Sequence, residues 1–115
     1  MLIQECKSLK DKQWFAMEYH GIECQQRKLV EEVHELNEAI TRIETKREQG
    51  FLLTDCKDIM TEIADVKNML EQIQMKYNID NIEVNHEKKY KIERHFNEME
   101  EEIKNGKSIK LDRGN

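Results

Sequence analysis

The sequence predicts an all-α fold, and three features of the chain support this prediction. Its 115 residues include no proline and only four glycines, so few residues interrupt a helix. Glu, Lys, Gln, Leu and Met, which are favourable in helices, dominate the stretches between those glycines. Apolar residues recur at helical spacing, and the alternation typical of strands is absent. The glycines at 21, 50 and 106 therefore divide the chain into long helical segments.

Four helices are expected along the chain. The first is predicted over residues 3–19 and the second over 23–47, each ending shortly before a glycine. The apolar side of the first helix is expected to contain Ile3, Cys6, Leu9 and Met17, with Trp14 and Phe15 toward its end. An apolar plug in the connection to the third helix is expected from Phe51, Leu52 and Leu53.

The third and fourth helices have recognisable start signals. Thr54 or Asp55 can cap the third, which is predicted to end near Tyr77, and Asp80 can cap the fourth. Glu83, three residues after Asp80, would complete a capping box. The apolar side of the fourth helix carries Ile92, Phe96, Met99 and Ile103. Because short connections favour antiparallel neighbours, we predict an antiparallel four-helix bundle over residues 1–104, followed by a loose tail at 105–115.

The composition narrows the classes of partner. A formal net charge of -5 argues against a nucleic-acid polymer. No apolar run approaches the roughly 18 residues that a membrane span needs, and the charged N-terminal stretch is unlike a signal peptide. Three widely spaced cysteines without a CxxC pair indicate reduced thiols. We therefore expect a cytoplasmic protein that binds neither membranes nor nucleic-acid polymers.

The second predicted helix places one acid on its apolar side. At about 100° per residue, its core stripe consists of Leu29, Val33, Leu36, Ile40 and Ile43. Glu31 and Glu38 lie on roughly the opposite side, where their charge is solvated. Glu32 instead falls about 60° from the centre of the stripe, and Glu35 lies about 60° further round, at the boundary.

The third predicted helix repeats this arrangement thirty residues later. Its core stripe consists of Ile59, Ile63, Val66, Leu70 and Ile73. Glu62 falls about 60° from the centre of this stripe, and Asp65 lies at its boundary. If the two helices face each other, four acids meet at one place.

Four converging carboxylates need a positive partner, because an isolated buried charge is costly and like charges repel. No lysine or arginine occupies a matching inward position on either helix, although Arg42 lies on the flank. A hard divalent cation with oxygen ligands would satisfy the cluster, and Mg²⁺ is the natural choice in a cytosol. The alternative is that Glu32 and Glu62 turn outward and pair with lysines from elsewhere. The pattern by itself leaves both interpretations open.

The same residues resemble the signature of a known family. Glu31-Glu32-Val33-His34-Glu35, followed after 26 residues by Glu62-Ile63-Ala64-Asp65, is similar to the EExxE…ExxD motif of the MazG-like all-α nucleoside triphosphate pyrophosphohydrolases, to which the dimeric dUTPases are related. The resemblance spans roughly residues 12–100 and includes the text KLVEEVHELNEAI and DIMTEIADVKNMLEQI.

The resemblance implies hydrolysis of a nucleoside triphosphate to the monophosphate and pyrophosphate, with Mg²⁺, or Mn²⁺ as a substitute. The implied metal ligands are Glu32, Glu35, Glu62 and Asp65. Glu35 would accept the proton of the attacking water, with Glu32 as the second catalytic carboxylate and Glu31 as an orienting neighbour. Family members are usually dimers or tetramers, so a homodimer or homotetramer is expected.

The substrate-binding residues expected alongside the metal are cationic or aromatic. On the fourth helix these are Lys88, Lys91 and Arg94, which would hold phosphates, unless they are only a solvated face. Lys28 is a weaker candidate, and Trp14, followed by Phe15, would contact the base unless it packs in the core. Arg42 stands where several relatives have an aromatic residue that stacks on the base, so the base preference does not carry over.

Two other interpretations compete with this one. A carboxylate-bridged di-iron bundle needs Glu-x-x-His motifs that project inward, and Glu31-x-x-His34 and Glu83-x-x-His86 have the spacing. Glu31 and His34, however, lie on the polar side of their helix. A non-catalytic helical adaptor that keeps the fold is the second alternative, because a fold does not fix a function.

Overall fold

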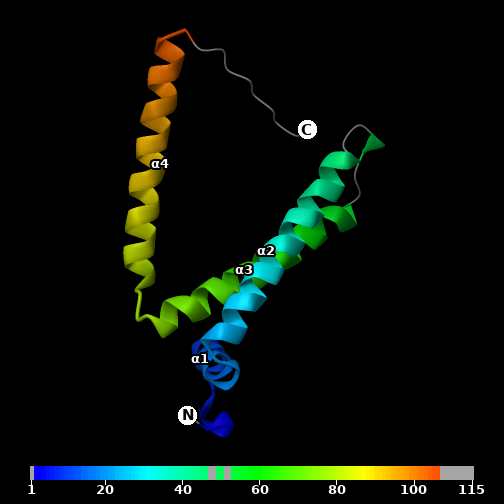
Figure 1. The fold of residues 1–115 in the computed structure, drawn as a ribbon, viewed down its shortest axis with the longest axis vertical. Helices are drawn as coiled ribbons and strands as arrows, with labels where there is room; N and C mark the ends of the chain where they lie inside the picture. The colour runs from blue at the N-terminus through cyan, green and yellow to red at the C-terminus, as the bar shows by residue number, and fades with distance from the viewer. Residues whose placement is uncertain (1, 47–48, 51–52, 107–115) are drawn as a thin grey trace. The chain divides into compact units, whose positions relative to one another are not determined.

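The computed structural model of the protein describes residues 2–46, 49–50 and 53–106 (Figure 1). Within these residues it contains a short 3-10 helix, η1, four α-helices and no strand, which confirms the predicted all-α class. The elements are η1 (Ile3–Glu5), α1 (Leu9–His20), α2 (Ile22–Thr45), α3 (Leu53–Lys76) and α4 (Asn81–Lys104). No helix in the described ranges is both long and apolar enough to cross a membrane.

The chain divides into two compact units. Residues 1–78, with η1, α1, α2 and α3, form the first, and residues 79–115, with α4, form the second. In the first unit, α2 and α3 run side by side in opposite directions, and α1 packs against both of them (Figure 1). Much of the predicted tail, from residue 107 onward, lies outside the described residues.

The first α-helix begins six residues later than predicted, because a capping box starts it at Leu9 rather than at Ile3. The Ser8 hydroxyl accepts the amide of Asp11 at 3.0 Å, and the Asp11 carboxylate accepts the amide of Ser8 at 3.3 Å. Ile3 and Leu9, expected on the apolar side, are both largely exposed, whereas Met17 is buried as expected. The helix ends at Gly21 as predicted, where a φ of 83° favours glycine.

The remaining helix boundaries agree with the predictions in part. Helix α3 already begins at Leu53, so Thr54 and Asp55 lie within its first turn and do not precede it as caps. Two residues of the predicted apolar plug, 51 and 52, lie outside the described residues. The Asp80 cap of α4 is confirmed, with its carboxylate accepting the amide of Ile82 at 2.8 Å. The bonded amide belongs to Ile82, the second helical residue, and not to Glu83, the third, as the predicted capping box requires.

The seam between α2 and α3 is rotated from the predicted core stripes toward the acids. From Gln25 onward, the buried or half-buried residues of α2 recur every three or four positions: Gln25, Leu29, Glu32, Leu36, Ala39 and Ile43. Four residues predicted for the core are instead exposed: Val33, Ile40, Ile63 and Leu70. At 100° per residue, the centre of the buried side is rotated from the centre of the predicted stripe by about 40° on α2 and by about 60° on α3. Helix α1 packs against the end of the hairpin that contains Ile22, Asn68 and Lys76, and the outer edges of both stripes remain exposed.

A chain of side-chain amides crosses the packed end of the three-helix unit. Gln25 donates to Gln72 at 2.7 Å, and Gln72 donates to Asn68 at 3.2 Å. Gln13 on α1 also donates to Asn68, at 3.0 Å. Gln25 and Gln72 are both buried, so this amide ladder ties the three helices together through their interior.

Helix α4 exposes all of its residues within its own unit. Its predicted apolar side exists as a continuous stripe, but Ile92 is 60% exposed and Phe96 is 56% exposed. The helix ends as predicted at Lys104, before Gly106 with a φ of 85°. The predicted four-helix packing is not established by this stripe and remains a prediction.

Candidate metal centre

The hairpin of α2 and α3 brings three of the four predicted metal ligands together. Glu32, Glu35 and Glu62 can each offer one carboxylate oxygen, and these oxygens lie within 4.8 Å of one another. Glu32 and Glu62 are half-buried, whereas Glu35 is exposed. The carboxylates converge because α2 and α3 form an antiparallel hairpin in which Glu32 and Glu62 lie at a similar level, each on the side that faces the other helix.

Asp65, the fourth predicted ligand, lies beside this group without belonging to it. It is half-buried one turn after Glu62, and its charge acts on both Glu32 and Glu62. We refer to Glu32, Glu35, Glu62 and Asp65 together as the carboxylate cluster.

The inner two carboxyls of the cluster are electrostatically disfavoured as anions. Desolvation is the main reason that the pKa of Glu32 is raised above its ordinary value, followed by repulsion from Asp65, Glu35 and Glu62. Desolvation also leads in raising the pKa of Glu62. Repulsion from Glu35 and Asp65 and a hydrogen bond with Glu35 add to this second shift.

Each of these two carboxyls also keeps one oxygen without a partner. Oε2 of Glu32 and Oε2 of Glu62 are inaccessible to solvent, and neither finds a hydrogen bond among the described residues. Buried polar atoms are nearly always satisfied in folded proteins, so each such exception needs an explanation. A third such atom, Oε1 of Gln25, lies in the amide ladder, whereas these two fall in one acidic cluster. A cation, or protons shared between the carboxyls, would satisfy them.

Two cations near the cluster only partly balance its charge. Lys28 lowers the pKa of Glu32 and Arg42 lowers that of Glu62, but both side chains are exposed and neither reverses the upward shift. Four carboxylates and two cations leave a net charge of -2 (-4 + 2) when all are ionised. Our sequence interpretation did not assign Arg42 to the site. The signal was present, because Lys28, Glu35 and Arg42 recur every seven residues and so share one line along α2.

The aromatic candidate lies away from the carboxylate cluster. Trp14 is half-buried and lines a hollow with Met17, Ile22 and Lys76. Lys76 follows Glu62 by 14 residues on α3, which is about 21 Å along the helix. The structure therefore does not bring Trp14 to the acids, and Glu31 is exposed on α2.

The cationic candidates on α4 belong to the second unit. Lys88, Lys91 and Arg94 are all exposed. Nε of Arg94 lies 3.9 Å from a carboxylate oxygen of Glu98, and its guanidinium lies 5.9 Å from the centre of the Tyr90 ring. These contacts occupy Arg94 within its own helix.

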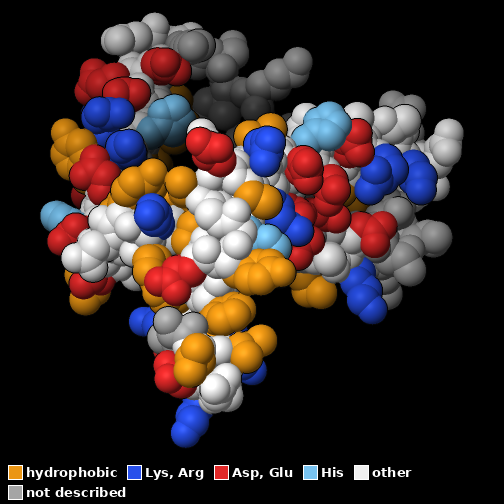
Figure 2. All heavy atoms as spheres, turned by 60° about the horizontal axis from the view of Figure 1, so that its bottom comes forward, with side chains coloured by type: hydrophobic (Ala, Val, Ile, Leu, Met, Phe, Trp, Pro, Cys, Tyr) orange, Lys and Arg blue, Asp and Glu red, His pale blue; other side chains and the backbone are white. Residues whose placement is uncertain are grey.

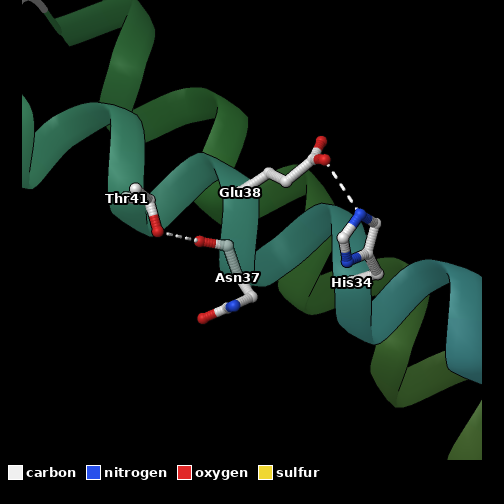
Figure 3. Close-up of polar contacts among 4 residues, drawn as sticks. All are labelled: His34, Asn37, Glu38 and Thr41. Carbon is white, nitrogen blue, oxygen red and sulfur yellow. Dashed lines mark hydrogen bonds and ion pairs between the residues drawn. The ribbon is translucent and has the colours of Figure 1, made fainter.

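The outward face of α2 argues against the di-iron alternative. Nε2 of His34 lies 2.9 Å from Oε1 of Glu38, with both side chains exposed (Figure 3). One turn further, Thr41 donates its hydroxyl to the carbonyl oxygen of Asn37 at 2.9 Å. His34 thus pairs on the solvated side of the helix and does not join the cluster, as its position on the polar side predicted.

Hydrophobic side chains reach the surface among acidic and basic ones, as Figure 2 shows for one face. On α2, four hydrophobic residues line a shallow groove together with His34 and Asn37. The four are Val30, Val33, Leu36 and Ile40. By helical spacing this apolar groove is centred roughly 150° around α2 from Glu32 and Glu35, so it is separate from the carboxylate cluster.

Comparisons with known proteins add no relative: no protein-family model, curated protein or solved structure matches the chain. The functional argument therefore depends on the residues and geometry of this chain.

Proposed function

We propose that the protein is a metal-dependent nucleoside triphosphate pyrophosphohydrolase of the MazG-like all-α type, acting in the cytoplasm. The carboxylate cluster would hold Mg²⁺ through Glu32, Glu35, Glu62 and Asp65. The observation that carries this proposal is the pair of buried, unpartnered Oε2 atoms of Glu32 and Glu62 within a group of converging carboxylates. A divalent cation would satisfy both atoms and offset the net charge of -2.

The carboxylates can hold a small cation once their side chains close around it. Mg²⁺ holds oxygens at 2.0–2.1 Å in octahedral geometry, so neighbouring ligand oxygens are about 2.9 Å apart. The oxygens of Glu32, Glu35 and Glu62 lie within 4.8 Å of one another, so they would move closer by up to about 1.9 Å on binding. An all-oxygen ligand set also favours Mg²⁺ or Mn²⁺ over the softer transition metals.

The chain's own residues divide the chemical work. A bound Mg²⁺ would neutralise the polyphosphate and lower the pKa of a water molecule. Glu35, the exposed member, can reach solvent and accept the proton of an attacking water, while the half-buried Glu32 and Glu62 fix the position of the centre. Lys28 and Arg42, on the same line of α2 as Glu35, supply positive charge toward phosphate oxygens. Lys88, Lys91 and Arg94 of α4 are proposed, from the sequence, to bind the outer phosphates. Trp14 is not proposed as the base contact of the same chain, because the hollow that it lines is remote from the cluster.

The proposed homo-oligomer has support in the exposed edge of the hairpin. Val33 and Ile40 on α2 correspond to Ile63 and Leu70 on α3, and all four are more than two-fifths exposed. A two-fold axis would set this face against the same face of a second copy. The result is an intermolecular bundle with two helices from each chain, in a homodimer or a dimer-based tetramer. It differs from the antiparallel four-helix bundle within one chain, which stays a separate prediction.

The function is tested by measuring pyrophosphate release from a panel of ribo- and deoxynucleoside triphosphates, with and without Mg²⁺. We compare the wild type, Glu62→Gln and Glu38→Gln, the last being a matched control because Glu38 pairs with His34 on the outward face. Mg²⁺-dependent release is expected, and Glu62→Gln should lower it by at least about tenfold, the lower end of what even indirect partners of a metal contribute. Release that Glu62→Gln leaves unchanged would refute the site. Metal binding without turnover of any nucleotide would favour the adaptor.

A further inference from the structure

Helix α4 carries a seven-residue repeat that its own unit does not use. In the lettering a to g of such repeats, positions a are Ile82, Lys89, Phe96 and Ile103, and positions d are Asn85, Ile92 and Met99. Five of these seven residues are apolar, and the helix is 24 residues, or about 36 Å, long. Apolar residues at a and d form the seam of a coiled coil.

The a and d positions are open to solvent within the second unit. Every described residue of that unit is exposed, including all five apolar members of the repeat. An amphipathic helix of this length gains most of its stability from packing its apolar side, so the stripe requires a cover.

The charges beside the stripe identify the kind of cover. In a parallel coiled coil, a g residue faces the e residue five positions later on the other helix. Lys88 at g would face the partner's Glu93 at e, and His95 at g would face the partner's Glu100 at e. Each contact occurs twice in a symmetric pair. In an antiparallel pair, e residues would instead face e residues, two of which are glutamates.

Two polar residues within the seam fit the same arrangement. Asn85 and Lys89 occupy consecutive d and a positions, and a polar residue there specifies register at some cost in stability. The ammonium of Lys89 already lies 4.0 Å from a carboxylate oxygen of Glu93, which gives its charge a partner at the edge of the seam. In-register pairing lets Asn85 meet the partner's Asn85, amide to amide.

We propose that α4 pairs with α4 of a second copy of this chain as a parallel, in-register coiled coil. This inference goes beyond the proposed hydrolase, because its interface excludes the carboxylate cluster and shares with the proposed substrate site only Lys88. The hairpin face with Val33 and Ile63 remains available for a second interface, so the coiled coil either reinforces one dimer or joins two dimers.

The first test is a cysteine cross-link in the full chain. In a background with Cys6→Ser, Cys24→Ala and Cys56→Ser, Met99→Cys is oxidised and the covalent dimer is measured. The matched control is Glu101→Cys, two residues on at the outermost f position. Parallel in-register pairing places the two Met99→Cys thiols opposite each other, within disulfide reach. We expect a dimer from Met99→Cys several times faster than from Glu101→Cys. Equal rates would overturn the proposal.

The second test reads the charge pairs. Lys88→Glu and Glu93→Lys are made separately in the Met99→Cys background, one of them with a size tag. Each alone sets like charges against each other across the seam, whereas mixing the two restores opposite charges in both contacts. Mixed dimers should clearly exceed the half expected from random pairing. Random pairing, or an excess of like dimers, would refute the coiled coil, and closure of α4 onto the hairpin would give random pairing. The Met99→Cys cross-link separates parallel from antiparallel packing, because only in-register parallel pairing sets the two thiols opposite each other.

Discussion

Replacing Glu32 by glutamine should leave the metal-free protein at least as stable as the wild type, while weakening its stabilisation by Mg²⁺. Glutamine keeps the shape of the side chain and removes the charge that desolvation and three neighbouring acids disfavour. An ordinary loss of a half-buried contact would instead destabilise the protein in both conditions. The opposite signs with and without metal therefore distinguish a binding site from a structural acid.

The size of the effect follows from the charges in the cluster. Four carboxylates and two cations give -2, and the substitution leaves -1 for a cation of +2. We take a tenfold loss of affinity, about 1.4 kcal/mol, as a conservative result of removing one ligand charge. At a Mg²⁺ concentration of about 100 times the wild-type Kd, the wild type gains about 2.7 kcal/mol and the variant about 1.4 kcal/mol. At roughly 4 °C per kcal/mol for a chain of this size, the Tm rises by about 11 °C and about 6 °C, respectively.

The assay is thermal unfolding, followed by circular dichroism, in EDTA and across a Mg²⁺ titration. Glu38→Gln serves as the control and should behave as the wild type, since Glu38 is exposed and pairs with His34. Equal Mg²⁺ shifts in the wild type and in Glu32→Gln would refute the reasoning. So would a loss of stability in EDTA matching the loss in Mg²⁺.

Three further outcomes follow from the same structure. In EDTA, the wild type should lose stability as the pH rises from about 4.5 through the raised pKa values of Glu32 and Glu62, because the folded state holds protons there that the unfolded chain has released. Mg²⁺ should reverse this dependence of stability on pH. Urea unfolding at several pH values measures it, and the same dependence with and without Mg²⁺ would contradict the prediction. Ile40→Ser together with Leu70→Ser should reduce the oligomer mass in sedimentation equilibrium and keep the helix content, because both residues are exposed within the chain. An unchanged mass would exclude the hairpin face as an interface. Gln72→Leu should destabilise the fold by about 1–3 kcal/mol, because it leaves the buried side-chain amide of Gln25 without its acceptor. Adding Gln25→Leu should recover most of the lost stability. Additive losses in urea unfolding would show that the 2.7 Å hydrogen bond does not couple the two residues.

Local signals identified several elements correctly because they act over a few residues. Gly21 and Gly106 end helices through a left-handed backbone that glycine adopts readily, and Asp80 caps α4 through one short bond. The Ser8–Asp11 capping box was equally visible, and overlooking it gave a first helix that started too early. The convergence of Glu32 and Glu62 followed from helical spacing and a hairpin between two long helices.

By itself, the sequence determined the helical class, the approximate helix boundaries and the inward placement of two glutamates, since 3.6-residue periodicity and capping chemistry are properties of single segments. Only the tertiary structure decided which edge of each apolar stripe is covered. Val33 and Ile63 were assigned to the core but are exposed, and Gln25 and Gln72 are buried. The packing of one helix against another determines which side of each helix is shielded from water, and this packing is not a property of a single segment. The same packing rotates the seam toward the acids and leaves two of their oxygens buried without a partner, which no single helix could have indicated.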